Sequence, residues 1–270
     1  MKARLKFSKT GSMRFIGHLD VMRYFQKAFR RANIAVSYSQ GYSPHQLMSF
    51  ASPLGIGLSS DAEYLDIVLD DTENTENFLP RINAVMNEEI TVTDFSVLTE
   101  EAKPSMAVLA GCDYLIALKP DKESFLTDAK ERSQVLERFQ ARDTVEILKK
   151  TKRSEKLTDI RENIYCITDE CRTFETFTGR NYQKLALDTT EYTPLLYCQL
   201  TAGSIVNIKP ELVLEALCQQ EGKEYNPFAY QIHRLEMYAD ANAKKGEIHT
   251  LHSEIPCKLV SLAEYERKNG

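Results

Sequence analysis

Two histidines, His18 and His45, lie in the most basic part of the sequence and are the first candidates for chemistry. A histidine side chain titrates near neutral pH, so it can act as a general acid or base in the cleavage of RNA. Neither residue is accompanied by a second acid–base group or by an activated nucleophile at a typical spacing. We therefore interpret both as hydrogen-bonding loop residues and keep a catalytic role as the alternative.

The segment SYSQGYSPH, residues 37–45, combines hydroxyl groups with turn-forming residues. Tyrosine rings stack on unpaired bases, and hydroxyl or amide groups bind phosphates and base edges. The side chains of this loop that could do so are Tyr38, Ser39, Gln40 and Tyr42. In the alternative interpretation the loop is only solvated, and Gly41 and Pro44 set its turns. A binding role is favoured because the loop adjoins a basic helix.

Positive charge is concentrated near the start of the sequence. Residues 1–60 hold nine basic residues and one acid, Asp20, so their net charge is +8 in a chain whose total is −5, and the remaining residues carry −13. This asymmetry favours an anionic partner such as nucleic acid; the alternative is that the basic side chains only solvate a strand and a helix. The predicted phosphate contacts are Lys2, Arg4, Lys6, Arg14, Arg23, Lys27, Arg30 and Arg31.

Residues 2–8 alternate between apolar and polar types, and period two predicts a strand with one buried and one exposed face. The polar face contains Lys2, Arg4 and Lys6, so we expect this strand to present an exposed basic surface.

Residues 18–33 carry apolar side chains at helical spacing, which predicts a helix. An acid in its first turn and two arginines in its last turn suit the helix dipole. Arg23, Lys27 and Arg30 follow one another at spacings of four and three residues, so they share one stripe of the helix surface.

The order of predicted elements indicates the fold. A strand, the helix, two strands, a second helix near residues 78–86 and a strand at 90–98 form the order β-α-β-β-α-β of a ferredoxin-like unit. A similar order follows, with strands predicted at 112–119, 144–152, 159–170, 195–204 and 229–239 and helices at 122–142 and 210–220. We predict an α+β protein with two tandem ferredoxin-like units and antiparallel sheets, the second unit enlarged. The expected domains are 1–103 and 104–240, followed by a polar tail at 241–270.

Composition excludes several classes of protein. The six cysteines are scattered without a CxxC pair, which argues against a zinc or iron–sulfur site and favours reduced thiols in the cytoplasm. There is no run of 18 apolar residues and no secretory signal, so neither a membrane span nor export is expected. The basic segment KKTKRSEK, residues 149–156, is either a second phosphate contact or a solvated hairpin tip.

The stretches RFIGHLDVMRYFQKAFRRANIAVSYSQGYSPH and LMSFASPLGIGLSSDAEYLDIVL closely resemble a family of bacterial radical-SAM-associated proteins of unknown function. In that family the domain occurs alone or fused behind a cobalamin-binding radical SAM enzyme, often encoded near ribonuclease G and ribosomal protein genes. The resemblance implies the signature residues His18, Asp20, Tyr38, Ser39, Gly41, Pro44, His45 and Glu63. At the level of fold alone, the layout also resembles the tandem ferredoxin-like RNA-processing proteins of CRISPR systems.

Together the residues and the resemblance favour a non-catalytic accessory subunit of a radical SAM enzyme. It would bind transfer or ribosomal RNA through its basic first domain while the enzyme modifies the RNA. The chain itself would bind no cofactor or metal; S-adenosylmethionine, an iron–sulfur cluster and cobalamin would belong to the partner. Two alternatives stay open: a metal-independent endoribonuclease that uses His18 or His45, and an adaptor that binds only proteins.

Overall fold

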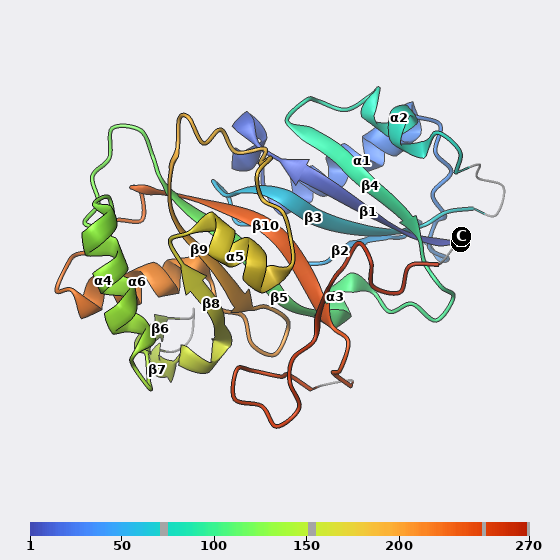
Figure 1. Cartoon of the computed structure of the whole chain (residues 1–270). Helices are drawn as coiled ribbons and strands as arrows, with labels where there is room; N and C mark the ends of the chain where they lie inside the picture. The colour runs from blue at the N-terminus through green and yellow to red at the C-terminus, as the bar shows by residue number, and fades with distance from the viewer. Residues whose placement is uncertain (71–74, 151–154, 245–246, 269–270) are drawn as a thin grey trace. The chain divides into compact units, whose positions relative to one another are not determined.

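The computed structural model describes residues 1–70, 75–150, 155–244 and 247–268, and Figure 1 shows its helices and strands. Contacts along the chain define two compact units. Unit 1 comprises Met1–Ala110, Glu236–Ala241 and Leu259–Gly270, and unit 2 comprises Gly111–Leu235 and Asn242–Lys258. The sequence predicts a first domain that ends at residue 103 and a separate tail at 241–270, whereas in the structure two later segments belong with unit 1.

Unit 1 follows the predicted order of elements. Its main elements are β1 (Lys2–Lys9), α1 (His18–Arg31), β2 (Met48–Phe50), β3 (Ser59–Val68), α2 (Phe78–Asn83) and β4 (Ile90–Val97). The strand order is β4-β1-β3, and β2 also pairs with β3; all three pairings are antiparallel. Shorter elements are the 3-10 helix η1 (Gly11–Phe15), α3 (Ser105–Val108) and β11 (Leu259–Ser261), which pairs with the end of β10 (Tyr230–Asp240).

The core of unit 1 lies between its helices and one face of its sheet. Leu5 and Phe7 of β1 pack with Phe25 and Phe29 of α1, and all four are fully or almost fully buried. The ring centroids of Phe7 and Phe25 are 4.8 Å apart. Because α1 buries this aromatic face, its opposite face, which carries the cations, is left in water.

Unit 2 has a different arrangement. Its elements are β5 (Leu109–Leu118), which begins in unit 1, α4 (Ala129–Gln140), β6 (Glu146–Lys150), β7 (Glu155–Asp159), the 3-10 helix η2 (Arg161–Asn163), β8 (Ile164–Thr168), α5 (Cys171–Thr178), β9 (Thr193–Thr201), α6 (Pro210–Gln220) and the first half of β10. Strands β5, β9 and β8 are neighbours in that order and pair antiparallel, whereas β6 and β7 form a separate two-stranded sheet.

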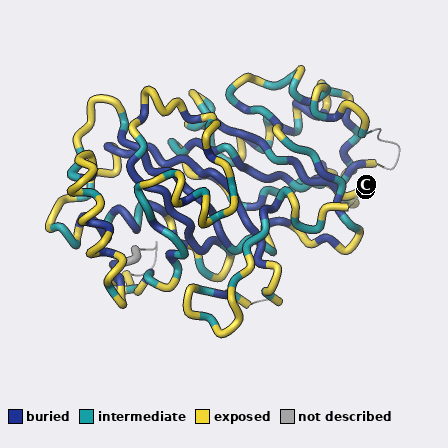
Figure 2. Tube along the Cα trace, viewed as in Figure 1, coloured by how far each residue is buried: buried dark blue, intermediate teal, exposed yellow. Residues whose placement is uncertain are grey.

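Both units combine helices with antiparallel strands, so the predicted α+β class is confirmed; the tandem ferredoxin-like arrangement stays a prediction. Figure 2 shows that most residues of the long strands are buried, while many residues of the helices and connections are exposed. In the part of the chain that the structure describes, no helix is both long enough and apolar enough to cross a membrane.

Candidate functional site

The outer face of α1 is an exposed row of cations. Arg23, Lys27, Arg30 and Arg31 are all exposed, on the side of the helix opposite Phe25 and the rest of its buried face. The guanidinium of Arg23 lies 3.3 Å from the Asp20 carboxylate, a solvent-exposed pair of little energetic value. We call Arg23, Lys27, Arg30 and Arg31 the helix cations.

Most of the charge on this row is uncompensated. Arg30 donates from Nε to the carbonyl oxygen of Gln26, and Arg31 donates to the carbonyl oxygen of Val85 at 2.8 Å. Among the described residues, no carboxylate pairs with Lys27, Arg30 or Arg31. A row of this kind is suited to a polyanion, because several charges are presented in register and already stand in water.

The expectation of an exposed basic face on β1 is wrong for Arg4. Its side chain is 1% exposed, and its Nε lies 2.7 Å from the Asp66 carboxylate, which is 13% exposed. The guanidinium also donates to the carbonyl oxygens of Leu262 and Tyr265 at 3.0 and 3.2 Å, and to that of Lys103 at 3.3 Å. Segments before β5 and after β11 therefore cover this face of the sheet, and Arg4 holds them in place.

The other two cations of this face are also engaged. Lys6 is half-buried, and its ammonium lies 2.8 Å from the carboxylate of Glu236, which itself accepts a hydrogen bond from the Tyr64 hydroxyl. Lys2 is exposed, but its ammonium donates to the carbonyl oxygens of Glu100 and Ala102. All three cations of this face thus form hydrogen bonds or ion pairs within unit 1.

The loop at residues 37–45 is closed by its own hydrogen bonds. Ser39 Oγ lies 2.9 Å from Nδ1 of His45 and accepts a hydrogen bond from the backbone N–H of His45 at 3.1 Å. Gly41 has φ +119°, a conformation that favours glycine, so it permits the turn at the tip. The ring of Tyr42 is fully exposed and that of Tyr38 half exposed, which leaves both able to stack on a base.

His18 and His45 have separate surroundings. His18 is half-buried at the start of α1, where its ring meets the edge of the Phe50 ring with 5.0 Å between centroids. His45 is exposed in the loop. No hydrogen bond or ring contact joins the two histidines in the described part of the chain, so they do not form a paired acid–base site.

His18 instead shares a small cavity with two buried charged residues. The cavity of about 20 Å³ is lined by Lys9, His18 and Glu63, together with apolar side chains. Lys9 is 2% and Glu63 3% exposed, and the Lys9 ammonium donates to the carbonyl oxygen of Ile16 at 3.0 Å. Burial lowers the pKa of the Lys9 ammonium, while the charge of the Glu63 carboxylate opposes this change. The volume is enough for about one water molecule.

Sequence reasoning missed the Lys9 part of this cavity. Period two places residue 9 on the apolar face with Leu5 and Phe7, but it does not reveal that Ile16, just after the 3-10 helix, supplies a carbonyl acceptor for a buried lysine. Glu63 was indicated only by the family resemblance, which includes it among the signature residues.

The potential metal ligands and the cysteines of the chain form no further site among the described residues. The described residues contain no cluster of three or more His, Cys, Asp or Glu side chains that could hold a metal ion. Burial raises the pKa of the Cys166 thiol to about 12 and that of Cys198 well above its usual range, so neither thiol is reactive at neutral pH. Of the basic segment 149–156, residues 151–154 lie outside the described residues.

Comparisons with known proteins add one clear relationship. Residues 2–210 match the model of a family described as uncharacterized protein conserved in bacteria (DUF2344). A search of the curated proteins finds no match. A chain of the solved structure "Crystal Structure of a Cbf5-Nop10-Gar1 Complex" is similar with a TM-score of 0.42 and 10% identity, over 87% of this chain and 48% of that chain. The present chain thus spans about half the length of that one, and a score this low does not establish a shared fold.

Proposed function

The chain belongs to a family of uncharacterized proteins conserved in bacteria (DUF2344), and we propose that it is a non-catalytic, RNA-binding accessory protein of a radical SAM enzyme. In this proposal it works in the cytoplasm and holds a transfer or ribosomal RNA on a ferredoxin-like unit 1. S-adenosylmethionine, the iron–sulfur cluster and cobalamin are bound by the separate enzyme.

The observation that carries the proposal is the row of helix cations on α1. Three of them lack a carboxylate partner among the described residues, and all four are exposed. Each phosphate that such a side chain neutralises releases counterions, which stabilises binding and makes it sensitive to salt. The exposed ring of Tyr42 adds a surface on which an unpaired base can stack.

A protein partner is supported by exposed apolar side chains at the start of α1. Phe15 is 59% and Leu19 60% exposed, and Ile56 is 67% exposed. The backbone N–H of Gly57 donates to the carbonyl oxygen of Arg14 at 2.9 Å, which holds the loop containing Ile56 against η1. Exposed apolar side chains that gather in one patch are typical of surfaces that contact another protein.

The decisive experiment is binding of the purified protein to a fluorescent transfer RNA pool and to ribosomal RNA fragments across a salt series. The test variant carries Arg23→Glu, Lys27→Glu and Arg30→Glu. The matched control carries Lys122→Glu, Lys130→Glu and Lys184→Glu, three exposed lysines of unit 2, and changes the net charge by the same amount. We expect the wild type and the control to bind with affinity that falls steeply with salt, and the test variant to lose most of its binding.

Three results would overturn the proposal. Equal binding by both triple variants would mean that only total charge matters. Binding that does not change with salt would exclude phosphate contacts by α1. Cleavage of the RNA by the wild type without added metal, lost in His45→Ala or His18→Ala, would replace the proposal with an endoribonuclease.

A further inference from the structure

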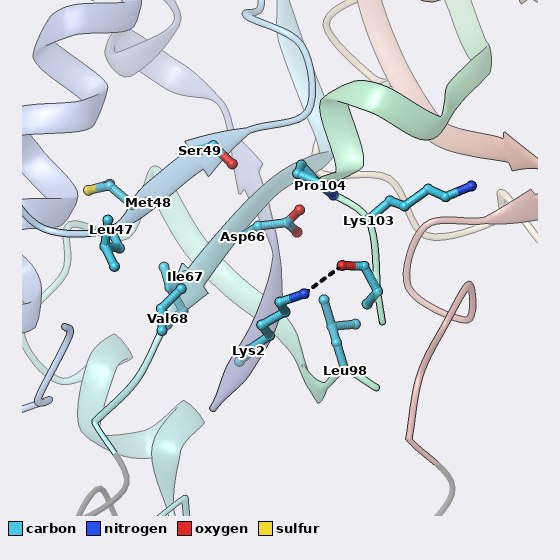
Figure 3. A pocket seen from close by; sticks show the side chains of 12 residues that line it. Lys2, Leu47, Met48, Ser49, Asp66, Ile67, Val68, Leu98, Lys103 and Pro104 are labelled. Carbon is cyan, nitrogen blue, oxygen red and sulfur yellow. Dashed lines mark hydrogen bonds between the residues drawn. The ribbon is translucent and has the colours of Figure 1, made fainter. Parts of the chain in front are cut away.

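Unit 1 contains a cavity of about 280 Å³. Of the residues proposed to bind RNA, only Lys2 lines it. It lies beside β2 and the ends of β1 and β3, and the segment of residues 98–104 forms its other side (Figure 3). A cavity of about 150 Å³ can hold benzene, so this one has room for a ring of that size with a short chain.

Most of the lining is apolar. Leu47, Met48, Ile67 and Val68 lie together on one side of the view in Figure 3, and Leu98 lies on another. Ile67 and Leu98 are buried, while Leu47, Met48 and Val68 are partly exposed. An apolar group that entered the cavity would therefore remove both its own surface and these side chains from water, which favours binding.

Among the described residues that line the cavity, Lys2 is the cation whose side chain lies beside the apolar ones (Figure 3). Its ammonium is fixed by the carbonyl oxygens of Glu100 and Ala102 at 2.6 and 2.9 Å, so one of its three N–H groups is left over. In the described residues no carboxylate pairs with it. Lys103 also lines the cavity, but its side chain extends away from the other labelled side chains in Figure 3.

The single acid of the lining does not cancel this charge. Asp66 accepts hydrogen bonds from Arg4 at 2.7 Å and from the backbone N–H of Ser105 at 2.6 Å. Its negative charge is thus balanced by the Arg4 guanidinium. The cavity consequently combines an apolar interior with one uncompensated positive charge at a fixed place.

We propose that this cavity binds a small amphiphilic anion, a molecule with an apolar or aromatic body and a carboxylate that pairs with the Lys2 ammonium. The carboxylate would accept the remaining N–H of Lys2, and the body would lie against Met48 and Val68. This site needs none of the helix cations, and of the predicted phosphate contacts it uses only Lys2.

The test uses 4-phenylbutyrate and its neutral counterpart 4-phenylbutan-1-ol as probes of the full chain. Protein labelled with ¹³C at the methionine methyl groups reports on Met48, whose signal is assigned with Met48→Leu. We expect 4-phenylbutyrate to shift the Met48 signal in a saturable way and to bind about tenfold more tightly than the alcohol, as a charge-assisted hydrogen bond implies. Lys2→Met should remove that difference and leave binding of the alcohol unchanged.

Two further variants keep the test decisive. Val68→Phe, at a partly exposed position, fills the cavity and should abolish binding of both probes, whereas Lys122→Met, at an exposed lysine of unit 2, should change neither. Thermal unfolding of each variant checks that unit 1 is folded. The proposal is overturned if Met48 does not respond to millimolar 4-phenylbutyrate, if the acid and the alcohol bind equally, or if Val68→Phe still binds. Loss of RNA binding in the helix-cation variant with retained binding of the probe would separate the two proposals.

Discussion

The cations of β1 and those of α1 belong to the same basic stretch of sequence, yet they have opposite surroundings. Arg4 is enclosed by one carboxylate and three backbone carbonyl oxygens, while Lys27 stands in water without a carboxylate partner among the described residues. A helix on one face of a sheet keeps its outer side in solvent. A strand has its second face covered whenever another segment packs on it, so its charges then become structural.

The largest expected difference between the two groups of cations is in stability, and it concerns Arg4. Arg4→Met leaves the mostly buried Asp66 carboxylate without its cation and leaves carbonyl groups of Leu262 and Tyr265 without a donor. We expect a loss of about 3–5 kcal/mol in the free energy of unfolding, measured with urea. Arg30→Met removes an exposed cation and should cost less than about 0.5 kcal/mol.

A second variant separates charge from packing in this result. Adding Asp66→Leu to Arg4→Met removes the uncompensated carboxylate and should recover part of the lost stability. Equal stability of Arg4→Met and Arg30→Met would show that the two groups of cations do not differ as described.

RNA binding gives the next largest contrast. Lys27→Gln should reduce the slope of log affinity against log salt by about one, because one phosphate contact is lost. Lys6→Gln should leave the slope unchanged, because the Lys6 ammonium is already paired with Glu236 at 2.8 Å. Fluorescence anisotropy with the same RNA at several salt concentrations measures both slopes, and equal slopes would contradict the assignment.

The smallest expected effect concerns pH and Lys9. Burial holds the pKa of the Lys9 ammonium in the folded state below its ordinary value of 10.5. Between the lowered pKa and pH 10.5, the unfolded chain therefore binds more protons than the folded chain. The free energy of unfolding should therefore rise with pH in that window and not below it. Urea unfolding at pH 7 to 10.5 should show this contribution in the wild type and in Lys27→Met but not in Lys9→Met. A difference between wild type and Lys9→Met that is constant with pH would contradict it.

Local signals predicted some helix ends well and missed helix α5 (Cys171–Thr178) altogether. Helix α6 spans Pro210–Gln220 as expected, because proline suits the first turn. Helix α1 begins at His18 as expected and ends two residues early. Helix α4 begins at Ala129 and not at residue 122, because the Asp128 side chain accepts a hydrogen bond from the Glu131 N–H and so caps the helix there.

The strands show what could not be predicted. Alternation placed Lys2, Arg4 and Lys6 on one face of β1, but it does not tell which segment covers that face. The acceptors of Arg4 at Leu262 and Tyr265 come from 258 and 261 residues further along the chain. The same limitation applies to the cavity beside Lys2, because alternation in β1 does not tell that residues 98–104 form the other side of that cavity.

The interleaving of the two units has a consequence for protein synthesis. Unit 2 occupies most of the chain between Arg4 and the carbonyl groups of Leu262 and Tyr265 that complete its surroundings. At about 5–20 residues per second, a ribosome makes these partners on the order of ten to fifty seconds after Arg4. The first unit to be started is therefore the last to be finished. During that interval the Arg4 guanidinium can pair with Asp66 but lacks its acceptors at Leu262 and Tyr265.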